Sequence, residues 1–232
     1  MTRPQTHEIQ LSIALMLMAI SVYLIWPELD LWVAGMFYTP TVGFEIASWP
    51  VVKAWHEAVP WVGRGMLVLA LLVLVFGKKI RLSLTTRRSA LALTVGMVLG
   101  IGLIIHAGFK DHWDRPRPVH LTNFGAAQTY VSPLTPGPGC NINCASFMSG
   151  HASTGFALIS IGALAGTRTR RRWLRMGWAA GFILGLVRMA QGGHFLGDVL
   201  FGGFVLWVCS WLTRVVYVRW RARRIFCRTM PS

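Results

Sequence analysis

Apolar residues in this chain fall into blocks separated by polar segments. A predominantly apolar block of about 20 residues is long enough to cross a bilayer as a helix. Six segments have this character, namely residues 9–26, 61–76, 90–109, 150–166, 177–191 and 199–217. The pattern predicts an all-α, polytopic membrane protein, a six-helix bundle that forms one domain over residues 1–232. The segment Leu31–Tyr38 is too short to span, and we expect it to lie at the interface.

The basic residues are distributed unevenly along the chain. There are 23 Lys and Arg against 8 Asp and Glu, a formal net charge of +15. Most of the basic residues precede the first block, lie between the second and third or the fourth and fifth, or follow the sixth. By the positive-inside rule these segments and both termini are cytoplasmic, and residues 27–60, 110–149 and 191–198 face outside. The charge thus indicates orientation and contact with anionic lipid rather than a nucleic-acid partner, and no protein partner is inferred.

The expected outer face collects an unusual set of polar residues at the ends of three blocks. A phosphate group presents several acceptor oxygens, which Arg binds bidentately and Lys binds as a point charge. The N–H groups at the start of a helix also favour an anion. The sequence therefore predicts a phosphate site that needs no metal, built from Lys110, Arg117, Ser149, Gly150 and Arg188.

Two histidines accompany these phosphate binders. One imidazole can attack phosphorus and form a phosphohistidine, while the other protonates the leaving oxygen. The candidates are His151 and His194. Asp198, four residues after His194, can accept the nucleophile's other N–H from a shared helix face. We expect neither a metal nor a cofactor, because the acidic and histidine residues of the outer loop have no convincing ligand spacing.

These residues stand in three recognisable strings. Lys110 with Arg117-Pro118, Ser149-Gly150-His151, and Arg188 with His194 and Asp198 resemble the signature motifs of the type 2 phosphatidic acid phosphatase superfamily. That superfamily includes bacterial acid phosphatases, membrane lipid phosphatases and vanadium haloperoxidases. The resemblance implies an all-helical bundle with metal-independent phosphatase activity and a pocket at the outer membrane face.

The resemblance also implies a role for each motif residue. His194 takes the position of the nucleophile, Asp198 that of its orienting partner and His151 that of the general acid, while the remaining motif residues bind phosphate. Two flanking positions depart from the family pattern. Met148 stands where Pro is common before Ser-Gly-His, and Val187 stands where Ser is common before Arg. Neither departure removes a residue that the mechanism requires.

The segment around Lys110 and the string before His151 are most similar to bacterial lipid A phosphatases and to related phosphatidylglycerophosphate phosphatases. We therefore expect an inner-membrane enzyme that removes a phosphate monoester from lipid A at the periplasmic face, by way of a phosphohistidine. The alternatives are phosphatidylglycerophosphate, undecaprenyl pyrophosphate or phosphatidate as substrate. A protein that only binds or transports lipid anions is a further alternative, although it would not need both histidines and the Asp. A haloperoxidase is disfavoured, because such proteins are soluble.

Two cysteines lie in the second outer loop, shortly before Ser149. Cys140 and Cys144 would form a short disulfide in an oxidising compartment and stiffen the loop. Two free thiols are the alternative, because so close a spacing makes the geometry of a bridge demanding.

Overall fold

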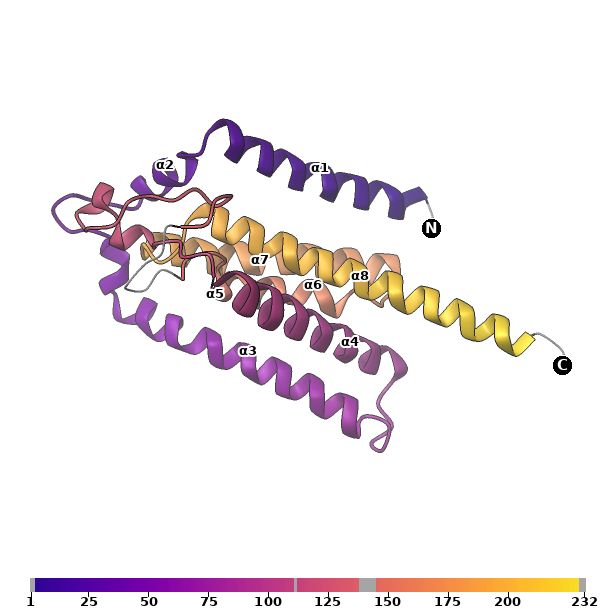
Figure 1. The fold of residues 1–232 in the computed structure, drawn as a ribbon. Coiled ribbons are helices and arrows are strands. Elements are labelled where there is room, and N and C mark those ends of the chain that lie inside the picture. The colour runs from indigo at the N-terminus through magenta and orange to yellow at the C-terminus, as the bar shows by residue number, and fades with distance from the viewer. Residues whose placement is uncertain (1–2, 111, 138–144, 230–232) are drawn as a thin grey trace.

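Helices make up the framework of the protein. The computed structural model describes residues 3–110, 112–137 and 145–229, and this part of the chain contains no named β-strand, which confirms the all-α prediction. The long helices run side by side as a bundle, with both termini at one end and the longer loops at the other (Figure 1). In chain order, the helices are α1 (Arg3–Ile25), α2 (Leu29–Gly35), η1 (Glu45–Ser48), α3 (Pro50–Phe76), α4 (Leu84–Val95), η2 (Gly96–Lys110), η3 (Pro118–His120), η4 (Thr122–Phe124), α5 (Gly150–Phe156), α6 (Leu158–Ile161), α7 (Thr167–Ala190) and α8 (Leu196–Thr229).

Four helical segments of the described chain are long and apolar enough to cross a membrane. They are Glu8–Ile25, Pro50–Phe76, Leu84–Lys110 and Leu196–Arg224. The other two expected spans coincide with the short helices α5 and α6 and with the second half of α7, whose first half carries five arginines. The total of six spans therefore stays a prediction.

Local signals move several helix ends beyond the apolar blocks. α3 begins at Pro50, well before the block at 61–76, because a proline fits the first turn of a helix, where its missing N–H costs nothing. Ser83 starts α4 by accepting a hydrogen bond from the Thr86 N–H at 3.1 Å. α2 is the short segment expected at the interface, although it begins and ends somewhat earlier than Leu31–Tyr38.

Three glycines spaced four residues apart let α7 pack closely against its neighbours. A Cβ atom at Gly177 would lie 2.5 Å from Ile159 of α6, and one at Gly181 would lie 2.1 Å from Phe156 of α5. A Cβ at Gly185 would lie 2.4 Å from Val199 of α8. Small residues at this spacing allow helix backbones to approach within a membrane. The close packing fixes the end of α7 beside the starts of α5 and α8.

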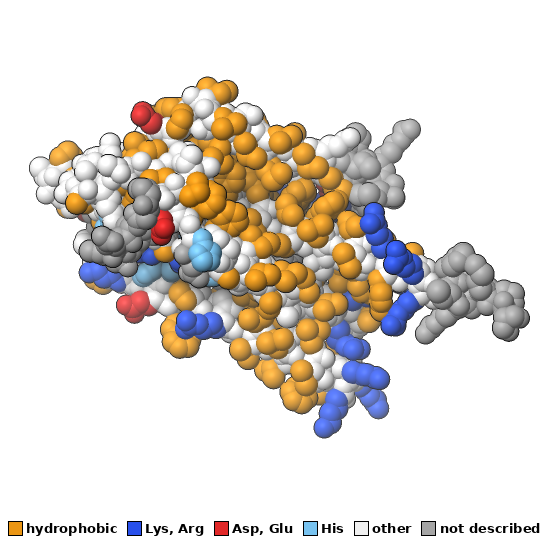
Figure 2. All heavy atoms as spheres, viewed as in Figure 1, with side chains coloured by type: hydrophobic (Ala, Val, Ile, Leu, Met, Phe, Trp, Pro, Cys, Tyr) orange, Lys and Arg blue, Asp and Glu red, His pale blue; other side chains and the backbone are white. Residues whose placement is uncertain are grey.

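The sides of the bundle and its ends differ in polarity. Hydrophobic side chains cover the long sides in the view of Figure 2, whereas Lys and Arg gather at the end that holds the termini. α1 stands away from the other long helices in Figure 1, and only 6% of its apolar window is buried. Glu8 pairs with Arg170 and Arg171 near one end of α1, and Tyr23 is buried near the other.

Candidate active site

The motif residues converge at the loop end of the bundle, opposite the termini. Lys110 ends η2, Arg188 lies in the last turn of α7, and Asp198 lies in the first turn of α8. Ser149 directly precedes α5. His194 lies in the turn between α7 and α8, rather than on the same helix as Asp198 as we expected.

His194 is buried and held by a backbone carbonyl. Its side chain is 2% exposed, and its Nδ1 atom lies 2.8 Å from the carbonyl oxygen of Ser146. A carbonyl oxygen only accepts hydrogen bonds, so Nδ1 carries the proton and Nε2 keeps a free lone pair. We expected the Asp198 carboxylate to accept the hydrogen bond from Nδ1, but its nearest oxygen lies 3.6 Å from Nδ1. At that distance Asp198 acts on the ring through its charge.

Asp198 is fully buried and rigidly oriented. One of its oxygens accepts hydrogen bonds from the Ser146 hydroxyl at 2.6 Å and from the Phe195 N–H at 2.7 Å, and the other accepts one from Arg115. The bond to Phe195 caps the first turn of α8, as an acidic side chain three residues into a helix commonly does. Asp198 therefore starts the helix and faces His194 at the same time.

The surroundings of His194 keep its imidazole neutral. Burial lowers the pKa of His194 to about 4, and the positive charges of Arg188 and Lys110 act in the same direction against the opposing effect of Asp198. A neutral imidazole with a free lone pair is the form that a nucleophile requires.

The start of α5 brings the Ser-Gly-His string to the site. The Ser149 hydroxyl caps the helix by accepting a hydrogen bond from the Ala152 N–H at 3.4 Å, and the Ser149 N–H donates to the backbone carbonyl of Asp198 at 3.1 Å. The Ser149 side chain is fully buried, so its structural role is to hold the N-terminus of α5 against α8.

His151 has a partner that the sequence did not indicate. Its Nε2 atom lies 3.0 Å from the carbonyl oxygen of His56, and the two imidazole rings stack with centroids 4.4 Å apart. The carbonyl accepts a hydrogen bond, so Nε2 of His151 carries a proton. His56 lies in a segment expected to be loop, and only the extension of α3 back to Pro50 places it here.

Two arginines present buried donors at the site. The Nε atoms of Arg117 and Arg188 are buried and have no hydrogen-bond partner among residues 3–110, 112–137 and 145–229. Arg188 is held by Gln191, whose Oε1 accepts a hydrogen bond from Nη1 at 2.5 Å. Its guanidinium lies against Gly193, where a Cβ atom would come within 2.3 Å of Nη2. Burial lowers the pKa of Arg117, which lies in the loop before η3. Buried donors without partners, next to one another, are suited to bind an anion.

Arg115 is a central residue of the site, although it belongs to none of the three motifs. Its side chain is fully buried, and it donates from Nε to the Val131 carbonyl at 2.8 Å and from Nη2 to Asp30 at 2.7 Å. Its third bond reaches Asp198. Asp30 comes from α2, so the segment between the first two spans contributes to the support of the site.

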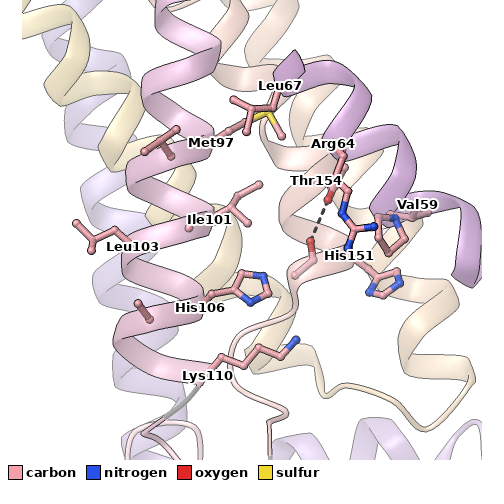
Figure 3. Close-up of a pocket in the computed structure, with 16 residues that line it drawn as sticks. Val59, Arg64, Leu67, Met97, Ile101, Leu103, His106, Lys110, His151 and Thr154 are labelled. Atoms are coloured by element: carbon pink, nitrogen blue, oxygen red, sulfur yellow. Dashed lines mark hydrogen bonds between the residues drawn. The ribbon is translucent and has the colours of Figure 1, made fainter. Parts of the chain in front are cut away.

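A pocket of about 640 Å³ opens beside the motif residues, between α3, η2 and α5. Figure 3 shows Lys110 and His106 of η2 facing His151 of α5 across it, with Arg64 of α3 beside Thr154. Three of the expected site residues line this pocket, namely Lys110, Gly150 and His151. The rest of its lining is chiefly apolar, and it includes Val59, Leu67, Met97, Ile101 and Leu103. His194 lies outside this lining, nearer to the loops.

Cys140 and Cys144 lie outside the described residues. Among the residues that the structure describes, no three His, Cys, Asp or Glu side chains gather as they would around a metal ion.

Comparison with known proteins identifies the family. The model of the PAP2 superfamily matches residues 90–223, which include every motif residue above. The chain is similar to the lipid A 4′-phosphatase of Francisella tularensis subsp. novicida, with 32% identity over 205 residues, or 85% of this chain and 90% of that protein.

Two further relatives carry the same name. Over 111 residues the chain is 32% identical to a lipid A 4′-phosphatase of Rhizobium etli, covering 48% of this chain and 41% of that protein. Over 106 residues it is 28% identical to one of Rhizobium leguminosarum, covering 46% and 45%. No solved structure gives a significant match. These matches confirm the resemblance carried by the three motifs, and the chain therefore belongs to the PAP2 superfamily and is a phosphoric monoester hydrolase.

Proposed function

We propose that this protein is a metal-independent lipid phosphatase of the bacterial inner membrane, which removes the 4′-phosphate of lipid A at the periplasmic face through a phosphohistidine on His194. The observation that carries the proposal is the pair of buried, unpartnered Nε donors of Arg117 and Arg188 beside a neutral imidazole. This is the arrangement that a phosphate monoester needs.

The first chemical step forms the covalent intermediate. The substrate phosphate binds between the guanidinium groups of Arg117 and Arg188 and the ammonium group of Lys110. The Nε2 lone pair of His194 attacks phosphorus, and the bond between phosphorus and the sugar oxygen breaks. His151, as an imidazolium, gives a proton to that leaving oxygen and becomes neutral. The Asp198 charge, 3.6 Å from Nδ1, stabilises the positive ring that forms.

The second step restores the enzyme. A water molecule attacks the phosphorus of phosphohistidine and gives its proton to His151, which now acts as a base. The bond between phosphorus and Nε2 breaks, inorganic phosphate leaves, and His194 returns to its neutral form. The fixed cations stabilise the equatorial oxygens in both transition states, and a preorganised set of donors is the largest contribution that such a site makes.

The pocket between α3, η2 and α5 suits the lipid portion of the substrate. Its apolar lining lies within two of the candidate spans, and the rim at the end of η2 and the start of α5 carries Lys110 and His151. An acyl chain lying along Leu67 and Ile101 leaves a headgroup phosphate at this rim. The names of the three relatives support lipid A as the substrate class and the 4′-position as the phosphate removed.

The orientation rests on charge. The end of the bundle that holds the termini carries the gathered Lys and Arg, which the positive-inside rule assigns to the cytoplasm. We therefore propose six spans in one domain over residues 1–232, both termini cytoplasmic and the site in the periplasm. A tag after Ser232 that labels from the periplasm in intact cells would refute this orientation.

Phosphate release from purified lipids tests the function. Detergent-solubilised protein is assayed with lipid A, phosphatidylglycerophosphate, undecaprenyl pyrophosphate and phosphatidate, and mass spectrometry locates the phosphate lost from lipid A. We expect release from the 4′-position of lipid A, which the His194→Ala variant does not catalyse. Release only from another lipid refutes lipid A as the substrate. Binding of every lipid without release indicates a protein that only binds or transports them.

A further inference from the structure

A chain of buried charges runs from α2 to the imidazole of His194. Arg115 lies between two carboxylates, with Nη2 2.7 Å from Asp30 Oδ2 and Nη1 bonded to Asp198 Oδ1. All three side chains are 0% exposed. The far carboxylate of this row is Asp30, and the near one is the partner of His194.

Both carboxylate oxygens of Asp30 accept hydrogen bonds. Its Oδ1 accepts hydrogen bonds from the Tyr23 hydroxyl at 2.6 Å and from the Gly197 N–H at 2.9 Å, while Oδ2 accepts from Arg115. Burial raises the pKa of the Asp30 carboxyl, while Arg115 and the hydrogen bonds from Tyr23 and Arg115 lower it, so the ionised carboxylate depends on these donors. The neighbouring Tyr130 has its pKa raised by burial, so it stays neutral.

The charges of the row do not cancel. Asp30 and Asp198 carry two negative charges and Arg115 carries one positive charge, while Tyr23 and Tyr130 are neutral neighbours. One negative charge is left over, and it lies next to His194. Without Asp30, Asp198 would be the single carboxylate paired with Arg115, and the pair would offset less of the charge that the imidazole gains on phosphorylation.

We propose that Asp30 is a positioning residue of the phosphatase reaction, which acts as the second counter-ion of Arg115 and thereby keeps the negative charge of Asp198 available to His194. The proposal rests on the phosphohistidine route proposed above. Asp30 touches neither the substrate nor His194, so its effect passes through Arg115 and Asp198. This role also explains why α2, which is too short to cross the membrane, contains the fully buried carboxylate of Asp30.

If Asp30 acts through its charge, removing that charge should lower kcat. If Asp30 acts only as part of the packing, removing one of its hydrogen bonds should lower kcat as much. The Asp30→Asn variant keeps the size of the side chain and removes its charge. We expect kcat for lipid A and for para-nitrophenyl phosphate to fall about 10- to 100-fold, the order of loss when the partner of an orienting group is removed, with KM changed less than about twofold. The Tyr23→Phe variant is the matched control, because it removes a hydrogen bond to the same carboxylate without removing charge, and its kcat should stay within about threefold of wild type.

A double variant separates the two effects further. Asp30→Asn combined with Arg115→Gln removes one charge of each sign, so the leftover negative charge on Asp198 returns. We expect its kcat to exceed that of Asp30→Asn alone, whereas two purely structural defects would add. Such non-additivity between contacting residues is the signature of direct coupling. If Asp30→Asn does not fold, Asp30→Glu retains the charge and should keep a measurable kcat.

Each result decides the matter. Wild-type kcat in Asp30→Asn, an equal loss in Tyr23→Phe, a double variant no better than the single one, or no activity in a folded Asp30→Glu protein each overturns the proposal. Failure of the wild-type protein to hydrolyse either substrate would instead refute the proposed function. Hydrolysis by wild type with an unaffected Asp30→Asn variant refutes only the role of Asp30.

Discussion

The carbonyl oxygen of Ser146 lies 2.8 Å from Nδ1 of His194 and sets the direction in which that imidazole reacts. Because the carbonyl only accepts hydrogen bonds, the proton is fixed on Nδ1 and the lone pair on Nε2. The same residue donates its hydroxyl to Asp198 at 2.6 Å. Ser146 therefore holds both the imidazole and its counter-ion, although it belongs to none of the three motifs.

Removal of the nucleophile should abolish turnover. We expect His194→Ala to lower kcat for lipid A by at least about 1,000-fold, since nucleophile deletions in enzymes with covalent intermediates have effects of this order or larger. Released phosphate and the yield of folded protein are measured together. Near-normal turnover in well-folded His194→Ala protein would exclude the assignment.

The loss of kcat on removal of the proton donor His151 should be larger for a poorer leaving group. Replacing His151 by Ala should lower kcat for lipid A about 100- to 10,000-fold, because a sugar alkoxide leaves poorly without a proton. The loss should be much smaller for para-nitrophenyl phosphate, whose phenolate leaves readily. Equal losses for the two substrates would show that His151 does not act on the leaving group.

The pH profile should reveal the lowered pKa of His194. Protonation removes the nucleophile, and burial lowers this pKa from 6.5 to about 4, so kcat/KM should persist below pH 6.5 and fall as the pH drops through about 4. The unfolded chain takes up this proton at higher pH than the folded one. The free energy of unfolding should therefore decrease as the pH falls from about 6.5 toward about 4. An acidic limb of kcat/KM near pH 6.5 would contradict the neutral, buried imidazole.

The absence of a side chain at Gly193 should be necessary for phosphate binding by Arg188. A Cβ atom there comes within 2.3 Å of Arg188 Nη2, so Gly193→Ala displaces the guanidinium. Loss of one charged hydrogen bond lowers kcat/KM about 10- to 100-fold. Gly35→Ala is the control, because its Cβ meets nothing within 4 Å. Identical kinetics in the two variants would show that Arg188 does not hold the phosphate.

Filling the apolar pocket should affect lipids and spare soluble substrates. Leu67→Trp places a large ring in the pocket that His151 also lines, and we expect KM for lipid A to rise while the kinetics with para-nitrophenyl phosphate change little. Leu72→Trp on the same helix lies outside the pocket and serves as the control. An unchanged KM for lipid A in Leu67→Trp would refute the pocket as the site of the acyl chain.

The sequence predicted the motif residues better than the residues that hold them in place. Motif spacing identified Lys110 and Arg117 because this spacing itself resembles that of the family. Residue type alone does not separate Arg117 from Arg115, since both precede a proline, and no sequence signal showed that Arg115 is held between two carboxylates while Arg117 offers an unpartnered donor. Asp30 lies 85 residues from Arg115 in sequence, and both side chains bind the start of α8, Asp30 at the Gly197 N–H and Arg115 at Asp198.

The helix ends show the same limit. An apolar block shows which part of a helix is hydrophobic, but it does not show where the helix begins. The start of α3 at Pro50 and the stacking of His56 on His151 were therefore not predicted. α7 illustrates the converse case. Its arginines were expected to form a connector, but they extend the helix to Thr167, because arginine is a good helix former.

The loose attachment of α1 makes the bilayer a structural component of the molecule. Its ends are fastened by Glu8 and Tyr23, while its middle leaves a pocket of about 340 Å³ that Met16 shares with η2 and α8. No water enters hydrocarbon there, so acyl chains of neighbouring lipids complete the packing on this side. Through the hydrogen bond from Tyr23 to Asp30, this loosely packed helix is joined to the charge row behind His194. The packing of α1 thus depends on the lipid or detergent around it as well as on the protein.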